Sequence, residues 1–234
     1  MKRIHDRQTS GENVVGQFLQ FRHLLKQWWL TASRDFPWRH HRSPYRTLIA
    51  ELMLRRTRAD QVVPVYERFV NSYPTLAMAA QADPCDIRAI LYPLGLSWRI
   101  ENIIDLLNQA YNRFGEVLPI DIEALLTLPG VGDYVAGAVA CFAGGQPVAL
   151  IDTNVVRVLG RVFGVDIQGE ARRRREMHDL TDSALDRDDP VTYQYALLDF
   201  AAKVCTAKNP FCNCCPFSQA SCCEFYKHFI IDKK

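Results

Sequence analysis

The cysteines are the residues best suited to chemistry, because six of the eight lie close together near the end of the chain. Their order is Cys205-x6-Cys212-x2-Cys215-x6-Cys222, with Cys214 and Cys223 as neighbours. In an unexported chain, clustered thiols point to metal or cluster ligation rather than to disulfides. One close C-x2-C pair instead of two favours a [4Fe-4S] cluster, and a zinc site remains the alternative.

Two carboxylates stand in unusual surroundings. Asp152 directly precedes an apolar run with helical spacing, so taken alone it predicts a helix cap. Glu51 lies among apolar neighbours such as Leu48 and Leu52, where an unpaired buried carboxylate would be costly and would titrate high. Such an environment suits acid–base work or the positioning of water. A solvent-facing place on an amphipathic helix is the alternative for Glu51.

A tight turn, Pro129-Gly130-Val131-Gly132, separates a predicted helix over 122–128 from one over 134–143 that is rich in small residues. Glycine permits positive φ and a close approach of the backbone to a ligand. The free N–H groups at the start of the second helix would then make the turn a seat for phosphate. An ordinary helix–helix corner is the alternative.

The elements that must position these residues are predicted to be helices. Apolar residues recur at helical spacing over 14–30, 48–53, 62–69, 100–111 and 155–162, whereas few runs alternate with period two. Ser43-Pro44 is typical of a helix start, and Tyr73-Pro74 and Pro93-Leu94-Gly95 are typical of helix ends. The predicted fold class is therefore all-α.

Composition limits the kind of protein. With 234 residues and 48% hydrophobic content, the chain can bury a real core in one or two domains. No apolar stretch is long enough to span a bilayer, and no signal-like core follows the charged first residues, so a protein that is neither secreted nor membrane-bound is expected. The 21 Arg against 7 Lys favour bidentate phosphate or base contacts.

Three motifs in this order resemble the helix-hairpin-helix DNA glycosylases of the endonuclease III superfamily. They are the segment 128–139 around the turn, the segment 148–159 around Asp152, and the cysteine cluster. The resemblance covers roughly residues 36–222. It implies a six-helix lobe with the hairpin over 44–144 and an iron–sulfur cluster lobe formed by 1–43 and 145–234. The active site would lie in the cleft between the lobes.

The resemblance also implies roles for single residues. Asp152 would stabilise the positive charge that builds on the sugar as the base departs. The segment from Glu51 to Thr57 resembles the mismatch-directed branches, where a catalytic Glu precedes residues wedged into the base stack, here Arg55, Arg56 and Thr57. The hairpin, Pro129, Gly130, Val131 and Gly132, would bind DNA. In the family the last gap between cluster cysteines is usually five residues, whereas the gap from Cys215 to Cys222 is six. Cys222 is the expected fourth ligand, and this departure makes Cys223 its competitor.

Position 134 separates the branches of the family. Lyase members carry a lysine there that attacks the sugar, but this chain has Tyr134 and no lysine between Lys26 and Lys203. The adenine branch usually has Ser at that position, Gln-Gln in place of Arg55-Arg56, and a long C-terminal domain for which a chain ending at Lys234 would leave no room. Tyr134 would instead pack against the flipped nucleotide.

The expected protein is thus a monofunctional DNA glycosylase that removes thymine or uracil mispaired with guanine. An adenine glycosylase acting opposite guanine or oxidised guanine is the alternative, and a non-catalytic DNA-binding or redox-sensing relative is the second. The implied cofactor is a [4Fe-4S] cluster, and the implied partner is double-stranded DNA with a mismatched or damaged base. A monomer in the cytoplasm, associated with the nucleoid, is the expected state. Among the basic residues, the run Arg172 to Arg175 is expected to be only a solvated helix face.

Overall fold

The computed structural model describes residues 11–95 and 97–231. Contacts along the backbone divide the chain into two compact units. One unit combines residues 1–34 with 149–234, and the other is the continuous stretch 35–148. All regular elements of the described ranges are helices, which confirms the all-α prediction. None of these helices has the length and apolar character that crossing a membrane requires.

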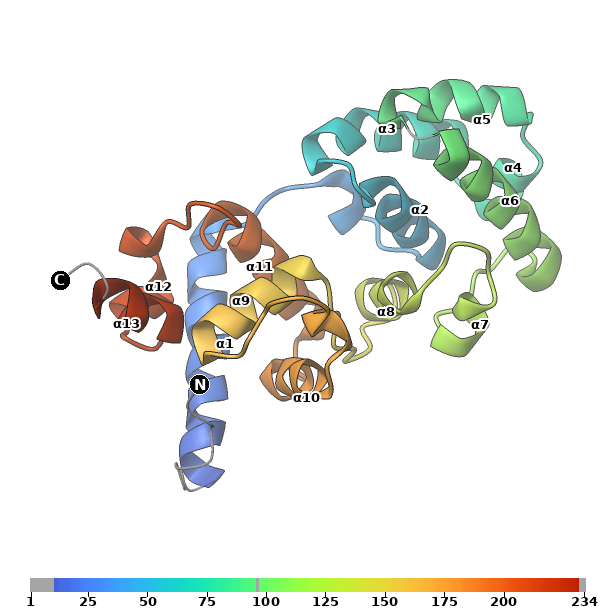
Figure 1. Ribbon diagram of the computed structural model, residues 1–234. Helices are drawn as coiled ribbons and strands as arrows, with labels where there is room; N and C mark the ends of the chain where they lie inside the picture. The colour runs from blue at the N-terminus through green and yellow to red at the C-terminus, as the bar shows by residue number, and fades with distance from the viewer. Residues whose placement is uncertain (1–10, 96, 232–234) are drawn as a thin grey trace. The chain divides into compact units, whose positions relative to one another are not determined.

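The continuous unit, 35–148, is a bundle of α-helices joined by short turns (Figure 1). Its helices are α2 (Pro44–Leu54), α3 (Ala59–Ser72), α4 (Leu76–Ala80), α5 (Pro84–Leu91), α6 (Ser97–Phe114), α7 (Ile122–Leu126) and α8 (Asp133–Phe142). One short 3-10 turn, Pro37–Arg39, precedes α2, and another, Tyr92–Leu94, lies between α5 and α6.

Helix α2 forms the centre of this unit, because eight of its eleven residues are buried. It packs against α3 and against α8, whose residues 135–142 are all buried. Ala136 and Val139 of α8 belong to the same buried cluster as Leu48 and Leu52 of α2. The residues on α2 and at the start of α8 are therefore held by one shared core.

The helix start predicted at Ser43-Pro44 and the helix ends predicted at Tyr73-Pro74 and Pro93-Leu94-Gly95 are confirmed. The Ser43 hydroxyl accepts a hydrogen bond from the Arg46 amide at 3.3 Å, and Pro44 is the first residue of α2. Helix α3 ends at Tyr73. Gly95 adopts φ +67°, a conformation open to glycine, which ends the turn before α6.

The other unit is built from both ends of the chain. Its helices are α1 (Gly11–Ala32), α9 (Thr153–Phe163), α10 (Arg175–Ala184), α11 (Pro190–Lys203), α12 (Pro216–Gln219) and α13 (Glu224–Ile231), with 3-10 turns at Ala171–Arg173 and Cys212–Cys214. Helix α1 packs along α11, and α9 packs against both α11 and α13. In the core, the Phe217 ring stacks on that of Phe21 and meets the Phe200 ring edge-on.

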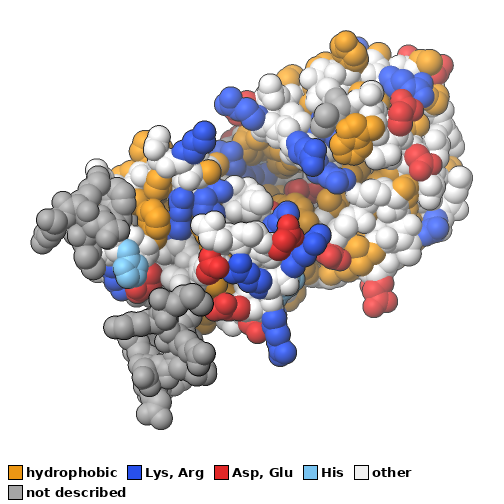
Figure 2. Space-filling view, viewed as in Figure 1, with side chains coloured by type: hydrophobic (Ala, Val, Ile, Leu, Met, Phe, Trp, Pro, Cys, Tyr) orange, Lys and Arg blue, Asp and Glu red, His pale blue; other side chains and the backbone are white. Residues whose placement is uncertain are grey.

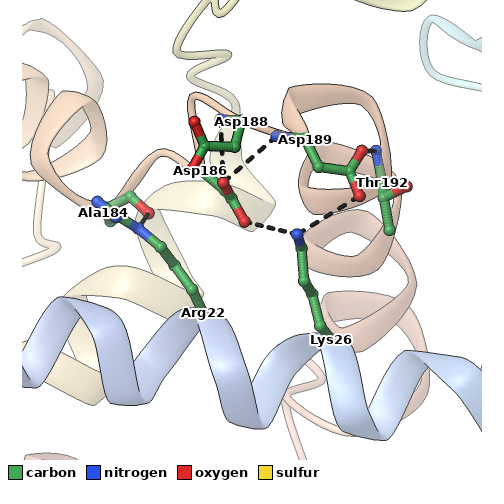
Figure 3. A network of polar contacts seen from close by, with 7 residues as sticks. All are labelled: Arg22, Lys26, Ala184, Asp186, Asp188, Asp189 and Thr192. Carbon is green, nitrogen blue, oxygen red and sulfur yellow. Dashed lines mark hydrogen bonds and ion pairs between the residues drawn. The ribbon is translucent and has the colours of Figure 1, made fainter.

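A polar network fastens α1 to the loop between α10 and α11 (Figure 3). The Lys26 ammonium lies 2.7 Å from an oxygen of Asp186 and 3.4 Å from one of Asp189. Asp189 also caps α11 by accepting the Thr192 amide at 3.3 Å. One turn earlier, Arg22 donates to the carbonyl of Ala184 at 3.1 Å. These contacts join segments about 160 residues apart in sequence.

The continuous unit begins earlier than the expected lobe boundary at residue 44, for a visible reason. Phe36 and Trp38 are buried, and their rings stack with centroids 4.8 Å apart. Trp38 also meets the Tyr66 ring of α3 edge-on at 5.4 Å. The aromatic residues ahead of α2 thus belong to the core of the 35–148 unit.

Candidate active site

The hairpin turn has the backbone form that the sequence predicts. Gly130 adopts φ +75°, and the Val131 amide closes the turn on the carbonyl of Leu128 at 3.3 Å. Gly132 then starts α8 with an extended backbone and no side-chain cap. Gly130, Gly132 and Asp133 are all exposed. The first amides of α8 therefore stand beside an open turn, the arrangement that suits a phosphate group.

Arg55 connects this turn to the end of α2, a contact that the sequence did not predict. One of its guanidinium nitrogens donates to the carbonyl of Gly130 at 2.9 Å. Arg55 is the residue that follows α2, and its neighbour Arg56 adopts φ +58°, a left-handed conformation that is uncommon outside glycine. The segment 55–57 and the hairpin thus meet on the surface of one unit.

A buried arginine, Arg99, binds the segment 55–57 through hydrogen bonds from the interior of the unit. Arg99, on the first turn of α6, is only 3% exposed. Its guanidinium donates to the carbonyls of Met53 (3.2 Å) and Leu94 (2.7 Å), to the Thr57 hydroxyl (2.9 Å) and to the carbonyl of Arg55. Burial lowers the pKa of Arg99, and the charge of Arg55 adds to this effect. The sequence does not reveal this role, because neither the type nor the spacing of a single arginine at the start of an amphipathic helix indicates that it is buried.

Glu51 lies within α2 and is 8% exposed, so it does not occupy the solvent-facing position that was the alternative. Its helix neighbours Leu48 and Leu52 belong to the core of the unit. Tyr134 lies on the first turn of α8, is partly buried and packs against the same core. Glu51 and Tyr134 are therefore placed by the packed helix pair α2 and α8.

Asp152 is the N-cap of α9, as its local sequence predicts. One carboxylate oxygen accepts the amides of Asn154 (2.8 Å) and Val155 (2.7 Å). The other oxygen accepts the side-chain amide of Asn154 at 2.8 Å. These three hydrogen bonds fix the orientation of a carboxylate that remains partly exposed.

A further chain of hydrogen bonds joins Asp152 to the cysteine region. The guanidinium of Arg157 donates to the side-chain oxygen of Asn154 at 3.0 Å and to the carbonyl of Cys205 at 2.8 Å. It also donates to the carbonyl of Ala201 at 3.0 Å. Burial lowers the pKa of Arg157. Asp152 is thus held through Asn154 and Arg157 by the loop that begins at Cys205, a link absent from the sequence prediction.

The clustered cysteines lie around the ends of α11, α12 and α13. Cys205, Cys215 and Cys223 are buried in one apolar cluster, which Cys222 borders. Burial raises the pKa of the thiols of Cys205, Cys212 and Cys222. Arg161 of α9 donates to the Cys205 sulfur at 3.5 Å and so supplies a positive charge that favours a thiolate.

The clustered thiols are ligands of the kind that an iron–sulfur cluster or a zinc ion takes. No group of three or more His, Cys, Asp or Glu over residues 11–95 and 97–231 is arranged to hold one metal ion. A tetrahedral zinc needs its sulfurs gathered at about 2.3 Å from one centre. In a [4Fe-4S] cluster each thiolate binds a different iron, so four cysteine thiols are the donor set that such a cluster needs.

Basic side chains line parts of both units, and the face in Figure 2 shows Lys and Arg side chains interspersed with acidic ones. Single arginines differ in their surroundings. Arg34 is committed to Asp199, with the two side chains 2.6 Å apart, whereas Arg42, Arg56 and Arg58 are exposed. Over 172–175, Arg172, Arg173 and Arg175 are exposed as expected, but the run crosses a 3-10 turn and the start of α10 instead of forming one helix face, and Arg174 pairs with Asp166 at 2.8 Å.

Two groups of site residues result, one in each unit. The 35–148 unit gathers Glu51, the segment 55–57, the hairpin 129–132 and Tyr134. The other unit carries Asp152 and the cysteines. The expected joining of both groups in a cleft stays a prediction.

Comparison with known proteins agrees with this architecture. Residues 49–182 match the family described as HhH-GPD superfamily base excision DNA repair protein. A thymine/uracil-DNA glycosylase of Pyrobaculum aerophilum is 39% identical over 217 residues, which cover 90% of this chain and 93% of that protein. An adenine DNA glycosylase of Mycobacterium tuberculosis is 37% identical over 194 residues, covering 82% of this chain and 64% of that protein.

Among solved structures, a thermostable thymine-DNA glycosylase superposes with a TM-score of 0.83 and 31% identity, covering 92% of this chain and 99% of that one. The helical fold, the hairpin and these matches define a DNA-repair protein of the helix-hairpin-helix class. The chain belongs to the HhH-GPD superfamily of base excision DNA repair proteins. The resemblance inferred from the three motifs is confirmed.

Proposed function

We propose that the protein is a monofunctional DNA glycosylase that hydrolyses the N-glycosidic bond of thymine or uracil mispaired with guanine. The observation that carries this proposal is the 39% identity to a thymine/uracil-DNA glycosylase over 93% of that protein. The superposition on a thymine-DNA glycosylase supports the same substrate class.

Asp152 is proposed to provide the charge that the reaction needs. As the base leaves with the bonding electrons, positive charge develops on the deoxyribose, and a fixed carboxylate stabilises it. The three hydrogen bonds from Asn154 and Val155 hold the carboxylate in one orientation before the substrate arrives. Thymine and uracil depart as stabilised anions, so protonation of the leaving base is less necessary than for adenine.

Glu51 is proposed to orient the pyrimidine or the attacking water. Its carboxylate sits on the central helix α2 in a mostly buried position, where a polar group has a strong effect on a nearby ligand. Tyr134, at the first turn of α8, is proposed to pack against the flipped nucleotide.

DNA binding is assigned to the surface formed by the segment 55–57 and the hairpin. The exposed amides at the start of α8 would seat a backbone phosphate. Arg55, Arg56 and Thr57 would fill the space left by the extruded base. A mismatched base costs less to extrude than a paired one, which favours mispaired substrates.

No strand cleavage is proposed, because the residue at position 134 carries no amine. A lyase needs an amine that attacks the sugar, and the chain has Tyr134 there, with no lysine between Lys26 and Lys203. The product would be an intact strand with an abasic site.

A [4Fe-4S] cluster is proposed as a structural cofactor, bound by Cys205, Cys212, Cys215 and a fourth cysteine of the pair Cys222–Cys223. When bound, the cluster would crosslink the ends of α11, α12 and α13. Its role would be structural, because hydrolysis of a glycosidic bond moves no electrons. A monomer acting on double-stranded DNA in the nucleoid completes the proposal.

Adenine excision is the second candidate, since an adenine DNA glycosylase matches at 37% identity. Single-turnover excision on labelled duplexes separates the two. Release of pyrimidine from G·T and G·U, with none from A·G or A·oxoguanine, is expected. Release only from the adenine-containing pairs would replace the proposal by the second candidate, and binding without release of any base would indicate a non-catalytic relative.

A further inference from the structure

The pair Cys222–Cys223 presents two sulfurs of different surroundings to the cysteine region. Cys223 is 7% exposed and belongs to the same buried cluster as Cys205 and Cys215. Cys222 is only partly buried and lies at the border of that cluster. Because the spacing departs from that of the family, it does not decide which of the two is the fourth cluster ligand, and the surroundings of each sulfur must be compared.

Hydrogen bonds point the two sulfurs in different directions. The Cys222 sulfur faces back along the chain, 3.4 Å from the carbonyl of Phe217 in α12. The Cys223 sulfur faces α9, 3.6 Å from the carbonyl of Arg161. The guanidinium of that same Arg161 contacts the Cys205 sulfur at 3.5 Å. Arg161 thus contacts both sulfurs, that of Cys223 through its backbone carbonyl and that of Cys205 through its guanidinium.

The electrostatic environment agrees with the geometry. The Cys223 sulfur lies within electrostatic reach of Cys205, Cys212 and Cys215. Cys205 and Cys212 likewise interact with Cys215 and with each other. Among the clustered cysteines, Cys222 interacts with Cys215. Cys214 is exposed and its sulfur contacts the Phe211 carbonyl at 3.4 Å.

We infer that Cys223, not Cys222, is the fourth ligand, so that the cluster is bound by Cys205, Cys212, Cys215 and Cys223. This inference rests on the cluster proposed above. It revises the expectation from spacing, because the chain between Cys215 and Cys223 forms the helix α12 and a turn at Ser221 with φ +55°. At the end of that path Cys223 is buried, whereas Cys222 is only partly buried.

The test compares Cys222→Ser with Cys223→Ser in the full chain, with Cys215→Ser as the control that both assignments require as a ligand. Iron and acid-labile sulfide per chain, together with the visible absorbance of the cluster, are measured in purified protein. We expect Cys222→Ser to keep the wild-type values, and Cys223→Ser to lose iron as Cys215→Ser does. The opposite pattern, equal loss, or full retention in both would overturn the assignment.

A second measurement avoids variants that fail to fold. Wild-type protein is alkylated at its native thiols before and after removal of the cluster with an oxidant and chelator, and each cysteine is followed by peptide mass spectrometry. Cys222 should react to the same extent in both samples, whereas Cys223 should gain reactivity only after removal. Protection of Cys222 that ends with cluster removal would contradict the inference. Wild-type protein without iron or sulfide would instead overturn the proposed cluster, a distinct outcome.

Discussion

At the scale of single residues, Asp152 combines a structural and a proposed chemical role. Its carboxylate caps α9 through two amides, while its remaining oxygen is bound by the side chain of Asn154. Asparagine is nearly as good an N-cap as aspartate, so Asp152→Asn should preserve the helix and remove the charge. We expect single-turnover excision to fall by roughly 10² or more while mismatch binding survives. A near-normal excision rate in this variant would remove Asp152 from the mechanism.

Asn154 and Arg157 are expected to position Asp152. Asn154→Ala removes one hydrogen bond to the carboxylate and leaves the backbone caps in place, so excision should fall by about tenfold with little change in stability. Excision kinetics and a urea unfolding curve measured on one preparation separate the two effects. A loss of stability in proportion to the loss of rate would mean that Asn154 acts only through folding.

Tyr134→Lys tests the hairpin register, because it places an amine where lyase members of the family carry theirs. Wild type should leave an abasic strand that breaks only in alkali and forms no borohydride-trapped adduct. The variant should gain some trapping and cleavage, provided its amine is partly neutral in this half-buried position. Binding to an abasic-site analogue is the control. Trapping by the wild type would contradict the monofunctional proposal.

Local sequence predicted those site features that depend on a few adjacent residues. The cap at Asp152, the turn at Gly130 and the start of α2 at Ser43 each follow from short-range hydrogen bonding and backbone freedom. The contacts of Arg157 with Cys205 and of Arg99 with Met53 join residues more than 40 positions apart. Periodicity carries no information about such pairs, so they became visible only in the fold.

At the scale of elements, Arg99 is the main support of the segment 55–57. Its burial without a carboxylate among its hydrogen-bond partners is costly, and four acceptors compensate for it. Arg99→Met should destabilise the protein by about 2–4 kcal/mol, because it leaves carbonyl groups unsatisfied in the interior. Urea unfolding measures this loss.

Arg99→Lys is the matched control, since it keeps the charge but has a different donor geometry. It should recover only part of the stability, and limited proteolysis should still cut near the segment 55–57 faster than in wild type. If Arg99→Met were as stable as wild type, the segment would have to be held by other contacts.

At the scale of the whole molecule, one unit must be assembled from the two ends of the chain. The helical periodicity over 14–30 and 155–162 predicted α1 and α9 but not that α1 packs along α11. The family resemblance supplied the expectation that the two chain ends form one lobe, with a boundary at residue 44. The fold begins the continuous unit at residue 35, because Phe36 and Trp38 bury their rings in its core.

The network of Lys26 and Asp186 gives this assembly a dependence on pH. Burial acts to raise the pKa of Asp186, but the hydrogen bond and charge of Lys26 outweigh it and hold the pKa below its usual range. A lowered carboxyl pKa stabilises the fold above the unfolded value of about 3.9, and this stabilisation is lost as the pH falls through the folded value. Asp186→Asn should therefore be less stable than wild type at neutral pH, with the difference shrinking below about pH 4. A difference in unfolding free energy that is independent of pH would contradict this account.

The most direct measurement of the central claim is single-turnover release of thymine from a G·T duplex, with a matched A·T duplex as the control. The account predicts that wild-type protein releases thymine from G·T only and leaves a strand that breaks on treatment with alkali. Folded, DNA-binding wild-type protein that releases neither thymine from G·T nor uracil from G·U would contradict it.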